Sequence, residues 1–72
     1  MTGKEWIREL ATRLNVEPPS EETVSALLEL AGVAAHSSER TAAPIACYLV
    51  AKAGVDPEKA LRLARPIAPE AK

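Results

Sequence analysis

The residues best able to do chemistry lie close together, between positions 36 and 40. His36 and Arg40 are four apart, so on a continuous helix they share one face. Arginine offers a planar fork of hydrogen-bond donors, and histidine offers a donor that changes with pH. Ser37 and Ser38 lie between them and could add two hydroxyls. This spacing is compatible with an anion-binding or nucleotide-phosphate-binding turn.

The same residues also have a structural interpretation, which we favour. A helix that ends near residue 38 leaves backbone carbonyls without partners, and His36 could donate to one of them. Arg40 could cap the helix C-terminus or pair with Glu29 or Glu39. Every helix end needs such partners, whereas few need a ligand. The two interpretations remain open at the level of sequence.

Signs of catalysis, metal binding or cofactor binding are weak. The chain has one Cys and one His, too few for a disulfide framework or a Cys-rich zinc module. Cys47 could find a base only in His36, with no evident orienting group, so a small structural hydrophobe is expected there. The three Gly residues lie far apart and form no phosphate loop. We therefore expect a non-catalytic protein, with no catalytic residues, metal or cofactor.

Four short helices must position these residues. Apolar side chains recur at intervals of three and four, without useful strand-like alternation, so the sequence predicts an all-α, compact bundle in a single domain of residues 1–72. Thr2 and Glu5 have capping-box spacing, Ser20 and Thr41 are candidate N-caps, and Asp56 precedes a proline. The expected helices are 3–15, 21–38, 42–53 and 57–65, and 66–72 is expected to be a frayed tail.

The apolar surface of so short a chain is hard to bury. A domain of this size hides only about 60% of the surface of its unfolded chain. Trp6 shares a stripe with Leu10 and Leu14 and is expected to anchor the core, and Gly32 is expected to mark a close helix crossing. If Trp6 is instead exposed, its face is an interface, and Tyr48 is the second interface candidate. A protein partner or self-association, for example as a homodimer, is therefore expected.

Charge and hydropathy limit the classes of partner that the sequence favours. The net charge is −1 and aromatic residues make up 3%, which argues against nucleic acid as a partner. The sequence shows no long uncharged apolar segment, so we expect no membrane span and a cytoplasmic location. Residues 1–40 carry a net charge of −3 and residues 41–72 one of +2, which could orient docking or align two copies head to tail.

One longer pattern resembles a known family. It consists of Ala35-His36, Arg40 and Ala42-Ala43-Pro44, with Trp6 near the start, Leu27-Leu28-x-Leu30-Ala31 before it and Tyr48-Leu49-Val50 after it. It resembles a small all-helical domain of unknown function that is common in actinobacteria. That domain stands alone, or is fused to or encoded beside proteins like molybdenum-cofactor guanylyltransferases. The chain departs from the family pattern at Ser37, Thr41 and Ala51, where Gly, Pro and Gly are frequent.

The resemblance covers roughly residues 6–53 and implies a neighbourhood rather than a reaction. It suggests a small accessory or interaction module linked to molybdenum-cofactor or molybdoenzyme metabolism. The alternative function is the anion- or nucleotide-binding module built on His36 and Arg40.

Overall fold

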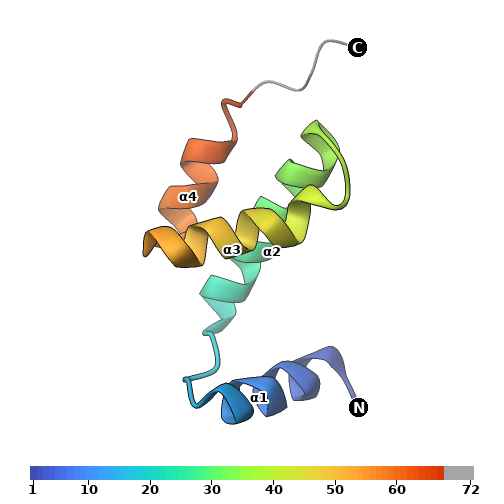
Figure 1. Ribbon diagram of the computed structural model, residues 1–72, viewed down its shortest axis with the longest axis vertical. Coiled ribbons are helices and arrows are strands. Elements are labelled where there is room, and N and C mark those ends of the chain that lie inside the picture. Colours follow the sequence, from blue (N-terminus) through green and yellow to red (C-terminus); the bar gives the residue numbers. More distant parts are fainter. Residues whose placement is uncertain (68–72) are drawn as a thin grey trace.

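The computed structural model describes residues 1–67, which form four α-helices and no strands (Figure 1). The helices are α1 (Gly3–Leu14), α2 (Glu21–Ser37), α3 (Ala42–Ala53) and α4 (Pro57–Ala64). The predicted all-α fold, a compact bundle of four short helices, is confirmed. Most of the tail predicted to fray lies outside the described residues.

Side-chain caps explain where α1, α2 and α4 begin. Thr2 Oγ1 accepts from the Glu5 backbone N–H at 3.1 Å, and Glu5 Oε1 accepts from the Thr2 N–H at 2.8 Å, which completes the predicted capping box. Ser20 caps α2 through the Thr23 N–H, and Asp56 caps α4 through the Glu58 N–H. These side chains satisfy donors that each first turn leaves free.

Three helices end one residue earlier than predicted, because the next residue cannot continue them or starts a turn. Asn15 adopts a left-handed conformation (φ 62°), which ends α1 at Leu14. Ser38 leaves helical geometry, and its hydroxyl donates to the Ala34 carbonyl at 2.8 Å. Arg65 caps α4 immediately before Pro66. Only α3 ends as predicted, at Ala53 before a left-handed Gly54.

The predicted cap of α3 is wrong in its chemistry. Thr41 occupies the N-cap position, but its backbone is helical (φ −66°, ψ −16°) and its hydroxyl makes no capping hydrogen bond. A side-chain cap needs an extended N-cap residue to aim its oxygen at the first turn. The Thr41 hydroxyl instead donates to Glu39 Oε1 at 3.4 Å. The Ala42 and Ala43 N–H groups donate to the Glu39 and Arg40 carbonyls, and these turn hydrogen bonds precede the regular helix.

The core is centred on α2, which packs against both α3 and α4. Leu30 on α2 is the most buried residue of the described chain, with 2% of its surface exposed. The other buried residues are Ala26 on α2, Ala60 and Leu61 on α4, and Ala11 on α1. Gly32 does not mark a close crossing, because a Cβ built there would meet no atom within 4 Å. That prediction is wrong.

Helix α1 lies apart from this core. Figure 1 shows it beyond the N-terminal end of α2, across the α2 axis, after a connection that contains Pro18 and Pro19. It packs extensively on none of the other three helices. The Val16 N–H donates to the Ala11 carbonyl at 3.0 Å, which folds the connection back over the end of α1. The described residues extend over 41 × 24 × 18 Å as a result.

Candidate functional site

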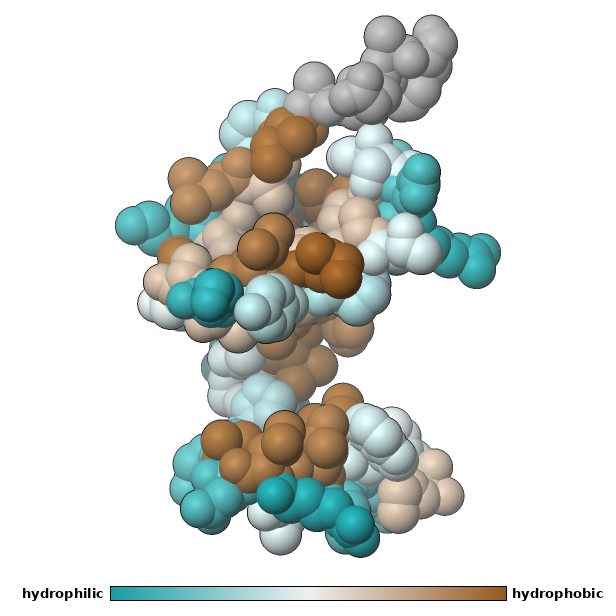
Figure 2. Space-filling view, in the orientation of Figure 1, coloured by the Kyte–Doolittle hydropathy of each residue, from teal (hydrophilic) through white to brown (hydrophobic). Residues whose placement is uncertain are grey.

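An apolar face lies on α1 and the adjoining part of α2. It carries Trp6, which is 56% exposed, together with Ile7, Leu10 and Leu14. Leu28 of α2 is 68% exposed and extends the surface beyond α1. Figure 2 shows the apolar atoms gathered over α1. We call these five residues the α1–α2 face: Trp6, Ile7, Leu10, Leu14 and Leu28.

The prediction that Trp6 anchors the core is therefore wrong. Trp6 does share a stripe with Leu10 and Leu14, but the connection to α2 places α1 apart from α3 and α4 (Figure 1). The periodicity of apolar residues shows which face of a helix is apolar. It does not show whether the rest of the chain or another molecule packs on that face. The condition of the alternative prediction, an exposed Trp6, is met, and the interface itself stays a prediction.

A groove runs between α1 and the first half of α2. Its apolar wall is formed by Ile7, Pro18, Pro19, Val24 and Leu28, and its volume is about 540 Å³. Across it, Lys4 Nζ lies 3.5 Å from Glu21 Oε2 and joins the two helices. Both side chains are largely exposed, so this ion pair stabilises the arrangement by at most about 1 kcal/mol.

Packing within the single chain leaves most of the apolar stripe of α1 exposed. Isolated helices shorter than about 12–15 residues are marginal in water, and amphipathic packing supplies most helical stability in proteins. α1 has 12 residues and a good capping box, but little of its apolar stripe is buried in the single chain. A partner that covered this stripe would supply the missing packing.

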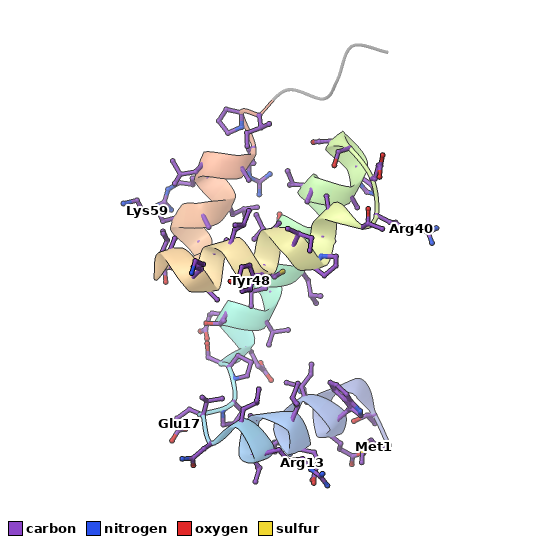
Figure 3. All side chains as sticks on the ribbon, viewed as in Figure 1. Met1, Arg13, Glu17, Arg40, Tyr48 and Lys59 are labelled. Atoms are coloured by element: carbon purple, nitrogen blue, oxygen red, sulfur yellow. The ribbon has the colours of Figure 1, made fainter. Side chains whose placement is uncertain are left out.

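The turn around His36 is less organised as a ligand site. His36 is exposed in the last turn of α2, and the shallow depression beside it is lined by Leu28, Glu29, Gly32, Val33 and Ser37. Ser38 uses its hydroxyl to close α2, as described above. Arg40 lies past the helix end, and Figure 3 shows its side chain directed away from the helices. The anion site stays a prediction.

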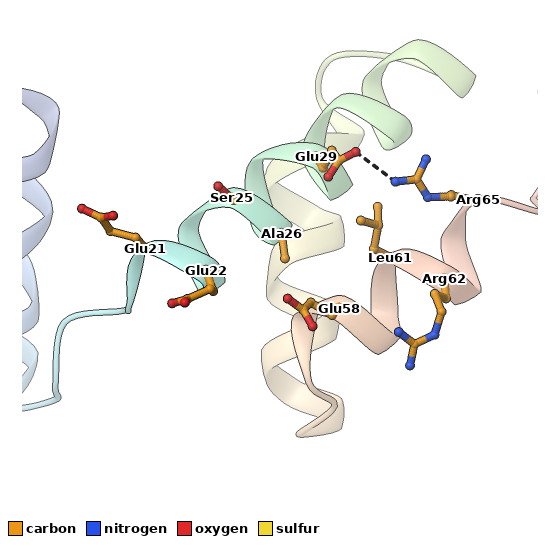
Figure 4. Close-up of a pocket in the computed structure, with 9 residues that line it drawn as sticks. All are labelled: Glu21, Glu22, Ser25, Ala26, Glu29, Glu58, Leu61, Arg62 and Arg65. Atoms are coloured by element: carbon orange, nitrogen blue, oxygen red, sulfur yellow. Dashed lines mark hydrogen bonds and ion pairs between the residues drawn. The ribbon is translucent and has the colours of Figure 1, made fainter.

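Glu29, one of the two carboxylates predicted as a partner of Arg40, pairs with another residue. Arg65 Nη2 donates to Glu29 Oε2 at 2.9 Å and ties α4 to α2 (Figure 4). These two residues are 36 positions apart. Sequence reasoning missed this pair, because only the packing of α4 on α2 brings them together. The available signal was the excess of acid in residues 1–40 and of base in residues 41–72.

This pair lies at an open polar groove of about 520 Å³ between α2 and α4. The groove mixes carboxylates with guanidinium groups, as Figure 4 shows: Glu21, Glu22, Glu29, Glu58, Arg62 and Arg65. Four carboxylates against two guanidinium groups leave the groove with a net negative charge, so it disfavours anions. Within residues 1–67, no three His, Cys, Asp or Glu side chains gather in a way that could hold a metal ion.

The remaining candidates lie on α3. Tyr48 is exposed beside Ile45 and Leu49, so α3 carries a second, smaller apolar patch (Figure 3). Cys47 is a free, half-buried thiol on the same helix. None of the helices in the described part of the chain is long and apolar enough to cross a membrane.

Comparison with known families gives one match, which extends over nearly the whole chain. Residues 1–70 match the Domain of unknown function (DUF6457). The chain belongs to this family. The DUF6457 match includes all of α1, so the exposed helix is part of the family domain and not an appendage to it. No curated protein and no solved structure matches the chain.

Proposed function

We propose that this protein is a small non-catalytic interaction module that binds a protein partner through the α1–α2 face. The observation that carries the proposal is the exposed apolar stripe of α1, with Trp6 at its N-terminal part. Tryptophan is enriched among the residues that dominate binding energy at interfaces. Contiguous apolar surface of this kind on a small domain is typical of a binding site.

The shape of the surface supports the same function. Ile7, Leu28 and the two prolines form the walls of a groove, while Lys4, Arg8 and Glu21 supply charge at its edge. An apolar centre with a charged rim is the common anatomy of protein interfaces. A helix or an extended segment with an apolar side could enter this groove.

The sequence resemblance suggests which partner to test first. A domain that is encoded beside, or fused to, proteins like molybdenum-cofactor guanylyltransferases is expected to contact them or a molybdoenzyme. We therefore propose an accessory role in molybdenum-cofactor metabolism, in the cytoplasm of an actinobacterium. The resemblance supports the link to molybdenum-cofactor metabolism. The apolar face supports only the binding function.

The experiment is a calorimetric titration of a guanylyltransferase-like protein from the same genome with the whole chain. The test variant is Leu14→Gln, which makes the α1–α2 face polar. The matched control is Leu63→Gln on α4, because both leucines are 62% exposed and lie in the last turns of their helices. The proposal predicts binding that Leu14→Gln weakens at least tenfold and Leu63→Gln preserves.

Three outcomes would count against the proposal in different ways. Binding that both variants preserve would show that the α1–α2 face is not the binding surface. Absence of heat with guanylyltransferase-like proteins and with molybdoenzymes would remove the molybdenum link. A chain whose Trp6 stayed exposed under every condition, with any candidate protein, would contradict the interaction module itself.

A further inference from the structure

We propose that the α1–α2 face is covered by a second copy of this chain, through an antiparallel contact between the two α1 helices. This inference rests on the proposed function, since it places a second copy on the same surface, from which a guanylyltransferase-like protein would have to displace it. It follows from three properties of α1: the area left exposed, the order of large and small residues along the helix, and the position of Arg13 relative to Trp6.

The exposed area is sufficient for a symmetric pair. From their exposed fractions, the five residues of the α1–α2 face leave roughly 500 Å² uncovered, so two copies together could bury roughly 1,000 Å². That is about the area at which an interface becomes specific, before flanking residues are included. A twofold pair uses the same patch on both copies, so one apolar face per chain is enough.

The order of residues along α1 is self-complementary. Gly3, Ile7, Leu10 and Leu14 follow one another at spacings of four, three and four, which forms a single helical seam. When two such seams run antiparallel, Ile7 of each copy lies opposite Leu10 of the other, and Leu14 lies opposite Gly3. Two large residues therefore meet at the centre, and a large residue meets the smallest one at each end.

The structure has room for this arrangement at its tightest point. A Cβ built on Gly3 would meet no atom within 4 Å, so the surface beside Gly3 is open. Gly3 also lines the groove between α1 and α2. Leu14 of the second copy, 62% exposed in the single chain, can occupy this space.

The charges that flank the seam fit the same direction. Trp6 and Arg13 lie on the same edge of the seam, seven residues apart. The antiparallel arrangement brings Trp6 of one copy near Arg13 of the other, at both ends of the contact. The Arg13 side chain is 76% exposed and is held by Glu9 through an Nε to Oε2 distance of 3.3 Å. Its guanidinium can therefore lie over the indole as a cation–π pair.

The experiment is sedimentation equilibrium of the whole chain over a wide concentration range, with circular dichroism to verify that each variant is folded. The proposal predicts a monomer–dimer equilibrium. Leu14→Gln should raise the dissociation constant at least tenfold, and the equally exposed control Leu63→Gln should change it less than twofold.

A second variant separates the antiparallel contact from simple stickiness. Gly3→Leu adds an apolar side chain to open space, so the single chain should keep its helicity. The added side chain also fills the space that Leu14 of the second copy would occupy, so the proposal predicts weaker dimerisation. If Gly3→Leu strengthened association, or if Leu63→Gln weakened it as much as Leu14→Gln, the antiparallel α1 contact would be refuted.

The failure of this inference can be told apart from the failure of the proposed function. A chain that is monomeric at every concentration, yet binds a guanylyltransferase-like protein in a manner that depends on Leu14, refutes the second copy and keeps the interaction module. A dimer that Leu14→Gln and Gly3→Leu both weaken supports the second copy, whether or not such an enzyme binds.

Discussion

Replacing Gly32 with alanine should stabilise the protein. Gly32 lies in the middle of α2, the helix on which α3 and α4 pack, and glycine costs about 0.8–1.0 kcal/mol relative to alanine inside a helix. The added methyl group meets no atom within 4 Å, so no steric term opposes this gain. We expect Gly32→Ala to raise the free energy of unfolding by about 0.5–1 kcal/mol.

The assay is thermal unfolding followed by helical circular dichroism at a fixed protein concentration. A gain of that size should raise Tm by roughly 2–8 °C in a domain of this length. The control is Gly54→Ala at the end of α3, where φ is +69° and an alanine is strained in spite of the open space around it. Gly54→Ala should lower the free energy of unfolding by about 1 kcal/mol.

A fall in Tm for Gly32→Ala would refute this reasoning. It would mean that some group approaches the Gly32 backbone in solution although none does in the single chain. Repeating the measurement after dilution would then show whether that group belongs to another copy. If Gly54→Ala left the free energy of unfolding unchanged, the left-handed conformation of Gly54 would not be the reason why α3 ends at Ala53.

Three further predictions concern single side chains. Leu30→Ala should lower the free energy of unfolding by about 2–5 kcal/mol, seen as a lower urea midpoint, because Leu30 is 2% exposed at the centre of the core; a loss below 1 kcal/mol would contradict that core. Thr2→Ala should fray α1 by removing its cap, with faster amide hydrogen exchange in α1 and little change in α2; uniform acceleration would show that α1 is coupled to the core. Arg65→Gln should cost less than about 1 kcal/mol in chemical denaturation, since its ion pair with Glu29 is half exposed; a larger loss would make that pair essential to the seating of α4.

The fold class and the helices could be predicted from the sequence because their signals are local. Thr2, Ser20 and Asp56 are caps whose hydrogen bonds reach only two or three residues along the chain. The errors of one residue at helix ends have local causes too, such as the left-handed backbone at Asn15. Thr41 has the right residue type for a cap, but the turn before it imposes helical backbone angles.

The arrangement of the helices could not be predicted, because it depends on contacts between distant residues. The stripe of Trp6, Leu10 and Leu14 is equally compatible with a core position and with an interface. A glycine in the middle of a helix, such as Gly32, is compatible with a close helix crossing, yet α3 and α4 approach α2 elsewhere. The pairing of Glu29 with Arg65 requires α4 to return to α2, and no spacing in the sequence encodes that.

The candidate site was found in part. The sequence predicts an interface at Trp6 on the condition that Trp6 is exposed. The structure meets that condition, and the interface itself stays a prediction. The groove between α1 and α2 was missed, since it is formed by the direction in which Pro18 and Pro19 lead the chain. The residue types between His36 and Arg40 are compatible with an anion site, but the structure does not bring all four side chains together. His36 and Ser37 line one depression and Ser37 and Ser38 line another, while Arg40 lines neither.

The most direct test of the central claim is the emission maximum of Trp6 as a function of protein concentration. Trp6 is the only tryptophan of the chain, so its emission reports on the α1–α2 face without labelling. If a second copy covers that face, the maximum shifts from the wavelength of water-exposed indole toward the blue as the concentration rises, and Leu14→Gln abolishes the shift. A maximum that stays at the water-exposed wavelength up to millimolar protein would contradict the claim.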